Sequence, residues 1–189
     1  YSKQSIARLP QCLAIETKDH EVLIVLEDLD KAGYPLRKVT ITWPEIAECL
    51  AWLAQFHASY LGKNPDGLWE VGTYWHLETR PQELEVLGDQ KLRAAAPIID
   101  ERLNTCKYKT LVHGDAKLAN FCFARDGRVA GVDFQYVGGG CGMKDVAYFI
   151  GSCLNESECE RLEAQILDTY FEYLQSALKE RNEALESEW

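Results

Sequence analysis

The chain has 189 residues, enough for one large domain, and 47% of them are hydrophobic, an ordinary share that can form a sizeable core. The formal net charge of −10 argues against a nucleic-acid partner, because phosphate binding needs basic stripes, and is compatible with a cationic substrate. No apolar run approaches the roughly 20 residues that span a bilayer, so no membrane partner is expected. There is no signal-peptide pattern, and the seven scattered cysteines without a C-x-x-C pair indicate reduced, mostly core thiols, so we expect a cytoplasmic protein.

The first predicted elements are two strands in "CLAIETKDHEVLIVLEDL", separated by a polar turn at residues 18–20. The second strand is an almost continuous apolar run, which is typical of a strand buried on both faces. Gly33 and Pro35 then interrupt the pattern and predict a linker.

The next segment, "TWPEIAECLAWLAQFHASYLG", predicts a helix that starts with a capping box of Thr42 and Glu45 and stops at Gly62. His57 lies on the apolar side of this helix, so we expect a packed core histidine. A loop, "NPDGLWEVGTYW", follows. Its aromatic residues are expected to pack on the surface of the core, with lining of a substrate pocket as the alternative; they include Trp69, Tyr74 and Trp75.

Residues 81–104 predict helix on both sides of Gly88. "TLV" then predicts a short strand, and "NFCFARDGRVAGVDF" predicts a hairpin through an Asp-Gly turn. The glycine-rich "VGGGCG" lacks the phosphate-loop pattern and predicts a flexible segment. Asp145 is expected to cap a short apolar helix, with a site role as the alternative, and Ser157 with Glu160 to form the capping box of a long amphipathic helix.

Polar side chains cluster in "LVHGDAKLANFCF" between apolar runs, where they cost free energy unless they are paired or used. Because the ends of two hairpin strands are neighbours, the residue after the returning strand lies beside the loop before the first one. We therefore expect Asp115, Asn120 and Asp133 to converge. Their oxygens are suited to Mg²⁺, and Asp115 would remain free to face a substrate hydroxyl. The alternative is a turn in which Asp and Asn cap backbone amides.

These residues also carry a resemblance. "HGDAKLAN" followed by "VDF" resembles the H-x-D-x-x-x-x-N catalytic loop and the metal-binding aspartate of kinases. Gly114 replaces the arginine of protein kinases, and the pattern is similar to the aminoglycoside phosphotransferase and choline kinase superfamily. With "VLEDLDKAGYP" and "GMKDVAYFIG" added, the chain most resembles the ecdysteroid kinase-like branch from Leu9 to Leu178.

The resemblance implies a role for each matched position. Asp115 would accept or orient the proton of the attacking hydroxyl, and His113 would brace the loop through hydrogen bonds. Asn120 and Asp133 would coordinate the Mg²⁺ that bridges the phosphates of ATP, the co-substrate. Lys117 matches no position that the family motif fixes, but it lies inside the loop and from there would reach the transferred phosphate.

The segment "VLEDL" would be the hinge between two lobes, where backbone groups near Glu27, Asp28 and Leu29 pair with adenine. The resemblance thus implies an α+β, protein-kinase-like fold. Residues 1–30 would be a remnant of the N-terminal lobe with the hinge strand, and residues 31–189 the helical C-terminal lobe with a short β insertion that carries the catalytic loop.

Most of an N-terminal lobe, including the lysine and glutamate that bind phosphates in complete kinases, is absent from these residues. Two hypotheses follow: an ATP-dependent kinase of a small-molecule hydroxyl, or a truncated pseudokinase that acts as a binding module. The hinge strand would also expose an apolar edge in this chain, so self-association through that edge is expected.

Overall fold

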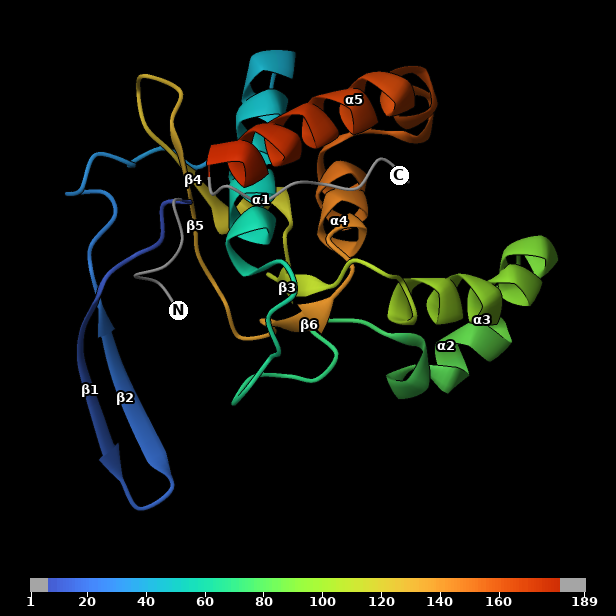
Figure 1. Cartoon of the computed structure of the whole chain (residues 1–189), viewed down its shortest axis with the longest axis horizontal. Helices are drawn as coiled ribbons and strands as arrows, with labels where there is room; N and C mark the ends of the chain where they lie inside the picture. Colours follow the sequence, from blue (N-terminus) through green and yellow to red (C-terminus); the bar gives the residue numbers. More distant parts are fainter. Residues whose placement is uncertain (1–6, 181–189) are drawn as a thin grey trace.

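The computed structural model describes residues 7–180. The elements follow in this order along the chain (Figure 1): β1 (Cys12–Lys18), β2 (Glu21–Leu26), α1 (Trp43–Tyr60), a 3-10 helix (Leu77–Thr79), α2 (Pro81–Val86), α3 (Gln90–Asn104), β3 (Thr110–Val112), a second 3-10 helix (Leu118–Asn120), β4 (Phe121–Phe123), β5 (Val129–Gly131), β6 (Gly138–Gly140), α4 (Met143–Cys153) and α5 (Glu156–Glu180). This α+β composition agrees with the expected class. Within the described residues, no helix is long and apolar enough to cross a membrane.

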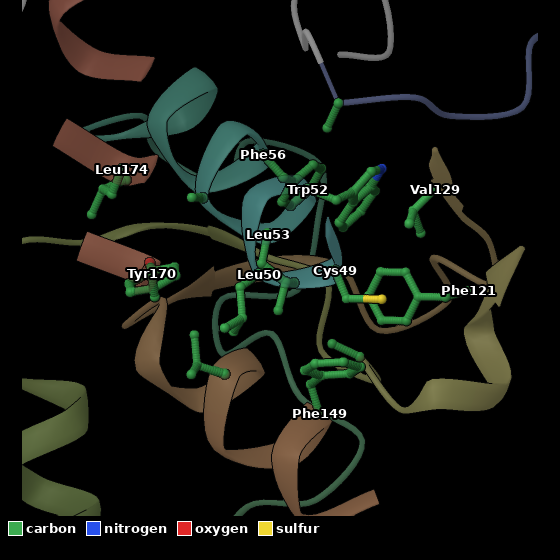
Figure 2. Close-up of a cluster of buried hydrophobic side chains, with 14 of the residues drawn as sticks. Cys49, Leu50, Trp52, Leu53, Phe56, Phe121, Val129, Phe149, Tyr170 and Leu174 are labelled. Carbon is green, nitrogen blue, oxygen red and sulfur yellow. The ribbon is translucent and has the colours of Figure 1, made fainter. Parts of the chain in front are cut away.

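Helix α1 lies at the centre of the core and packs mainly against α5, with further contacts to α4, β3 and β5 (Figure 1). The predicted capping box is present, since the Thr42 amide donates to Glu45 Oε2 over 2.7 Å. Inside the core, Trp52 stacks on Phe56 with 5.3 Å between ring centroids and meets the edge of Phe121 at 5.4 Å (Figure 2). Each such buried aromatic contributes about 1.5–3 kcal/mol.

The strands form three antiparallel pairs: β1 with β2, β3 with β6, and β4 with β5. The β4–β5 pair is the hairpin that the sequence predicts, and its turn places Gly127 at a φ of 95°. The β3–β6 pair was not expected. Residues 138–140 form a strand on β3 instead of a flexible segment, which corrects the prediction for "VGGGCG". Because they have no side chains, other backbone can approach closely: a Cβ on Gly138 would lie 2.2 Å from the Trp69 carbonyl oxygen.

The hairpin β1–β2 has the predicted strands and turn, but the expected burial is wrong. Every residue of both strands is exposed, and the hairpin extends away from the helical core (Figure 1). The apolar run of β2 therefore has nothing packed over it within the described residues. Self-association through this hairpin stays a prediction.

Two helix starts also differ from the expectation. Helix α4 begins at Met143 after Gly142, so Asp145 is in its first turn and is not the N-cap. At α5 the capping box lies two residues earlier than predicted. The Glu158 amide donates to Asn155 Oδ1 over 3.0 Å, and the Asn155 amide donates to Glu158 Oε2 over 3.0 Å.

Helices α2 and α3 lie beside the core, on the side of α4 and β6 (Figure 1). The break at Gly88 is as predicted, and Asp89 caps α3 by accepting from the Lys91 and Leu92 amides. Neither helix has a buried residue, and several of their apolar side chains line a space between them and α4.

Candidate active site

The loop after β3 (residues 113–120, called the catalytic loop after the role that the resemblance implies) starts with a backbone conformation that only glycine adopts easily. Gly114 has a φ of 83°, and a Cβ there would lie 2.2 Å from the Tyr136 carbonyl oxygen. An arginine at this position would therefore be strained and would clash with backbone. The Gly114 carbonyl accepts from the Tyr74 amide over 2.6 Å, which ties the loop to the segment before α2.

Asp145, in the first turn of α4, fixes the start of the loop by hydrogen bonds. It is buried, and its two oxygens accept from the His113 amide over 2.6 Å and from the Gly114 amide over 3.0 Å. His57 donates to the same carboxylate over 3.0 Å and is itself bonded to the Tyr170 hydroxyl over 2.9 Å. The expectation that His57 is a packed core histidine is confirmed.

Burial by itself raises the pKa of Asp145, but the hydrogen bond and charge of His57, and those from His113, lower it, and the net pKa lies below 3.8. Sequence reasoning favoured a helix cap for Asp145 and kept a site role as the alternative. No local signal decides between the two, because its partners lie in α1 and in the loop after β3, at least 31 positions away.

His113 lies at the inner side of the loop and is fully buried. The Asp115 amide donates to its Nδ1 over 3.2 Å, which leaves Nε2 to donate to the Val132 carbonyl over 2.8 Å. The ring thus connects the catalytic loop to the end of β5, and it also contacts Phe134 with 4.5 Å between centroids.

Asp115 is buried, and its two carboxylate oxygens differ in their surroundings. Oδ2 accepts from Lys117 Nζ over 2.7 Å and from Asn120 Nδ2 over 3.0 Å. Oδ1 has no hydrogen-bond partner within the described residues. A buried carboxylate oxygen without a partner costs free energy, so this atom is available to accept a proton or a hydrogen bond from a ligand.

Lys117 and Tyr148 both lie near Asp115. The hydrogen bond to Asp115 raises the pKa of Lys117, with smaller contributions from Tyr148 and Asp133. Burial, followed by the negative charge of Asp115, raises the pKa of the Tyr148 hydroxyl on α4. Lys117 is therefore a cation, and Tyr148 a neutral hydroxyl, near the carboxylate.

Asp133 has an exposed side chain on strained backbone. Its φ of 67° is uncommon for a residue other than glycine. The Val132 amide donates to the Asn120 carbonyl over 2.9 Å, which places the backbone of Asp133 beside that of Asn120. Strain of this kind costs about 1–3 kcal/mol and is found at functional sites.

The structure thus gathers Asp115, Lys117 and Asn120 and brings Asp133 alongside. Within residues 7–180, no group of three or more His, Cys, Asp or Glu side chains could hold a metal ion. The Asn120 amide oxygen and the Asp133 carboxylate are nevertheless the hard ligands that suit Mg²⁺, which usually takes only one or two protein ligands and completes its shell with water and phosphate oxygens.

The predicted hinge residues lie where β2 ends. The Glu27 carboxylate is held by Arg8 over 2.7 Å, and this hydrogen bond lowers the pKa of Glu27. Asp28 accepts from the Asp30 and Lys31 amides, and Leu29 is buried. Nucleotide contacts would therefore involve backbone. Within the described residues, the Glu27 carbonyl and the Leu29 amide make no backbone hydrogen bond.

A cavity of about 630 Å³ lies between α2, α3, α4 and the catalytic loop. Its walls include Gly114, Asp145 and Tyr148, so it reaches the catalytic loop next to Asp115. The rest is mainly apolar; the larger apolar side chains are Leu77, Leu84, Leu87, Leu92, Ile99 and Leu103. A space of this size holds a typical small-molecule ligand.

Of the three aromatic residues in the loop before α2, one lines the cavity and the other two pack on the surface of the core. Trp75 lines the cavity and donates from Nε1 to Glu83. Trp69 is mostly exposed and donates to the Gln135 carbonyl over 2.8 Å, and Tyr74 packs on Tyr136 with 5.2 Å between centroids.

Comparison with known proteins identifies the sequence family. The sequence profile of the ecdysteroid kinase-like family matches residues 1–65 and 72–183. A search of curated proteins found no match.

Several solved structures share the fold. An aminoglycoside-3′-phosphotransferase of type VIII matches 96% of this chain and 70% of its own, with a TM-score of 0.53 and 17% identity. The amicoumacin kinase hAmiN, solved with AMP-PNP, Ca²⁺ and Ami, matches 88% of this chain and 50% of its own, with a TM-score of 0.53 and 18% identity. A choline/ethanolamine kinase family protein from Mesorhizobium loti matches 95% and 69%, with a TM-score of 0.50 and 13% identity. The chain thus spans between half and about 70% of the length of these structures.

Proposed function

Because the chain belongs to the ecdysteroid kinase-like family, we propose that it transfers the γ-phosphate of MgATP to a hydroxyl group of a small molecule. The observation that carries this proposal is the state of Asp115. One of its oxygens is fixed by Lys117 and Asn120, and the other is buried without a partner beside a ligand-sized cavity.

The free oxygen gives Asp115 the part of a general base. The acceptor hydroxyl would donate to Oδ1 while its oxygen attacks the γ-phosphorus. The bond from that phosphorus to the β-phosphate oxygen breaks, ADP leaves, and the hydroxyl proton passes to Asp115. A positioned base of this kind accelerates a reaction about 10²–10⁴-fold. The fixed Oδ2 keeps the carboxylate in one orientation, which favours a productive geometry.

Lys117, Asn120 and Asp133 would act on the phosphate side. Phosphoryl transfer depends mainly on positioning and on neutralising charge. Mg²⁺, when bound, supplies positive charge to the phosphates, and Asn120 and Asp133 would hold it. The Lys117 ammonium, bonded to Asp115, would be placed between the base and the transferred group. The Glu27 carbonyl and the Leu29 amide would contact adenine.

The acceptor would bind in the cavity on the α4 side of the catalytic loop. Its largely apolar walls favour an acceptor with an apolar body over a polycation, although the net charge of the chain alone is compatible with a cation.

A second candidate is a binding module without catalysis. Such a module would need none of the lysine and glutamate that complete kinases use on the phosphates. The strained Asp133 favours the enzyme, because strain with no catalytic use would be lost without harm to the core.

The test is ADP release by the full-length protein with MgATP and a panel of hydroxylated small molecules. We expect acceptor-dependent turnover that falls about 10²–10⁴-fold in Asp115→Asn. Asp126→Asn is the matched control, since it makes the same change at the exposed hairpin turn, and its activity should equal that of the wild type. Nucleotide binding without phosphorylation of any acceptor would favour the binding module.

A further inference from the structure

The one half-buried ammonium in the described cavity wall belongs to Lys144, in the first turn of α4. Its Nζ donates to Asn104 Oδ1 over 2.9 Å, and Asn104 Nδ2 donates to Asp100 Oδ2 over 3.0 Å. These three side chains, here called the Lys144 network, connect α4 to the end of α3. Both Lys144 and Asp100 line the cavity.

The ammonium is only partly satisfied. A lysine has three donor hydrogens, and within the described residues Lys144 uses one of them in a hydrogen bond. Burial lowers the pKa of Lys144, while the negative charge of Asp100 acts in the opposite direction. A charged group in an apolar space costs free energy until its remaining donors find acceptors, and a ligand in the cavity is placed to provide one.

Lys144 and Tyr148 lie on the same face of α4. They are four residues apart, which corresponds to a rise of about 6 Å along a helix axis. Tyr148 is next to Asp115, where a hydroxyl would react, and Ala147 between them also lines the cavity. A ligand that extends along α4 would therefore meet Asp115 at one end and Lys144 at the other.

We propose that the cavity recognises its ligand at two points: a hydroxyl next to Asp115 and Tyr148, and a second oxygen that accepts a hydrogen bond from Lys144. The ligand class is an uncharged molecule with an apolar body and at least two oxygen functions. This inference rests on the proposed function for the identity of the reacting hydroxyl, whereas the contact with Lys144 is a matter of binding alone.

Charge favours a neutral oxygen as this second function. A cationic group cannot accept a hydrogen bond from the Lys144 ammonium, and a carboxylate would add negative charge to a wall that already contains Glu83 and Asp100. A carbonyl, ether or hydroxyl oxygen accepts from Lys144 without either penalty.

The test measures binding without nucleotide, so that it does not depend on catalysis. The probes are two rigid diols, 4,4′-bicyclohexanol and decalin-2,6-diol, each compared with the monoalcohol of the same skeleton by calorimetry on the full-length protein. We expect at least one diol to bind roughly tenfold more tightly than its monoalcohol, the effect of one hydrogen bond to a charged group. In Lys144→Met this preference should disappear while the affinity for the monoalcohol stays within about twofold.

Lys144→Arg keeps the donors and should retain most of the preference. Lys179→Met removes an exposed lysine of α5 and should behave as the wild type. Thermal unfolding of all variants shows whether the cavity is intact. Equal binding of diol and monoalcohol by the wild type, no binding of either diol, or a preference that survives in Lys144→Met would each overturn the proposal. None of these results would bear on ADP release, which tests the proposed function separately.

Discussion

The catalytic loop and the β1–β2 hairpin are opposite solutions to the placement of side chains. In the loop, polar residues are buried: His113 and Asp115 are 0% and 1% exposed. In the hairpin, apolar residues are on the surface: Ile15 and Ile24, which face each other across the two strands, are 65% and 54% exposed. Each region therefore contains the residues that burial rules would assign to the other.

The difference shows which geometry this chain determines by itself. The buried polar groups of the loop have partners in α4 and at the end of β5, and Asp145 of α4 is in turn bonded to α1 and through it to α5, all within the described residues. The apolar side chains of the hairpin have no such cover. We infer that the loop keeps its shape without any further contact, whereas the surroundings of the hairpin depend on what covers it.

The largest expected effect is on the loop, through Asp145→Ala. This change removes the acceptor from two backbone amides and from His57 at once, in a site from which water is excluded. Loss of one partner from a buried charged network costs about 3–5 kcal/mol. Urea unfolding should show this loss in the free energy of unfolding.

Tyr170→Phe is the graded control, because it removes only the outer bond to His57 and should cost about 1 kcal/mol. If Asp145→Ala costs no more than Tyr170→Phe, the loop is not held by this carboxylate.

Acid should weaken the same network. The folded pKa of Asp145 lies below the 3.8 of an ordinary aspartate, so its contribution is complete above that pH and is lost as the pH falls further, through the folded value. The wild type should therefore lose stability below about pH 4 more steeply than Asp145→Ala does.

A medium effect, of opposite sign for stability and for activity, is expected at Asp133. Asp133→Gly removes the strain of the left-handed backbone, so the free energy of unfolding should stay the same or rise by up to about 1 kcal/mol. Activity should fall at least as far as in Asp115→Asn, since the phosphate side loses its carboxylate. Both are measured on one preparation, by urea unfolding and by ADP release.

Asp133→Asn separates charge from backbone, because asparagine also tolerates this conformation. It should unfold like the wild type and be inactive. Full activity in either variant would remove Asp133 from the proposed mechanism.

Much of this arrangement is predictable from the sequence. The capping box of Thr42 and the Asp-Gly turn are signals within a few residues, and the structure contains both. The closeness of Asp115 and Asn120 follows from their spacing in one loop. Asp133 follows the returning strand of a hairpin, so the sequence predicts that it lies beside Asn120. In the structure, the hydrogen bond from the Val132 amide to the Asn120 carbonyl brings the two backbones together.

The remainder depends on contacts between distant residues. Asp145 has the local pattern of a helix cap, but its partner His57 is 88 positions away. The glycines of β6 carry no side-chain pattern that indicates a strand, and their pairing with β3 is made by backbone alone. The apolar run of β2 correctly predicts a strand, but burial requires a second surface, about which hydropathy says nothing.

The smallest effect on stability is expected in the β1–β2 hairpin. It tests whether the apolar side chains of the hairpin are exposed in solution, in contrast to the buried side chains of the loop. Replacing Ile15 and Ile24 together by threonine keeps β-branched residues in the strands and removes exposed apolar surface. At low protein concentration the free energy of unfolding should change by less than about 0.5 kcal/mol, whereas the same change at buried Ile46 should cost more than about 2 kcal/mol. Light scattering should show self-association in the wild type that the double variant reduces, because an exposed apolar strand edge pairs readily with another chain. A monodisperse wild type, or a double variant as unstable as Ile46→Thr, would mean that the hairpin is covered in solution as the loop is.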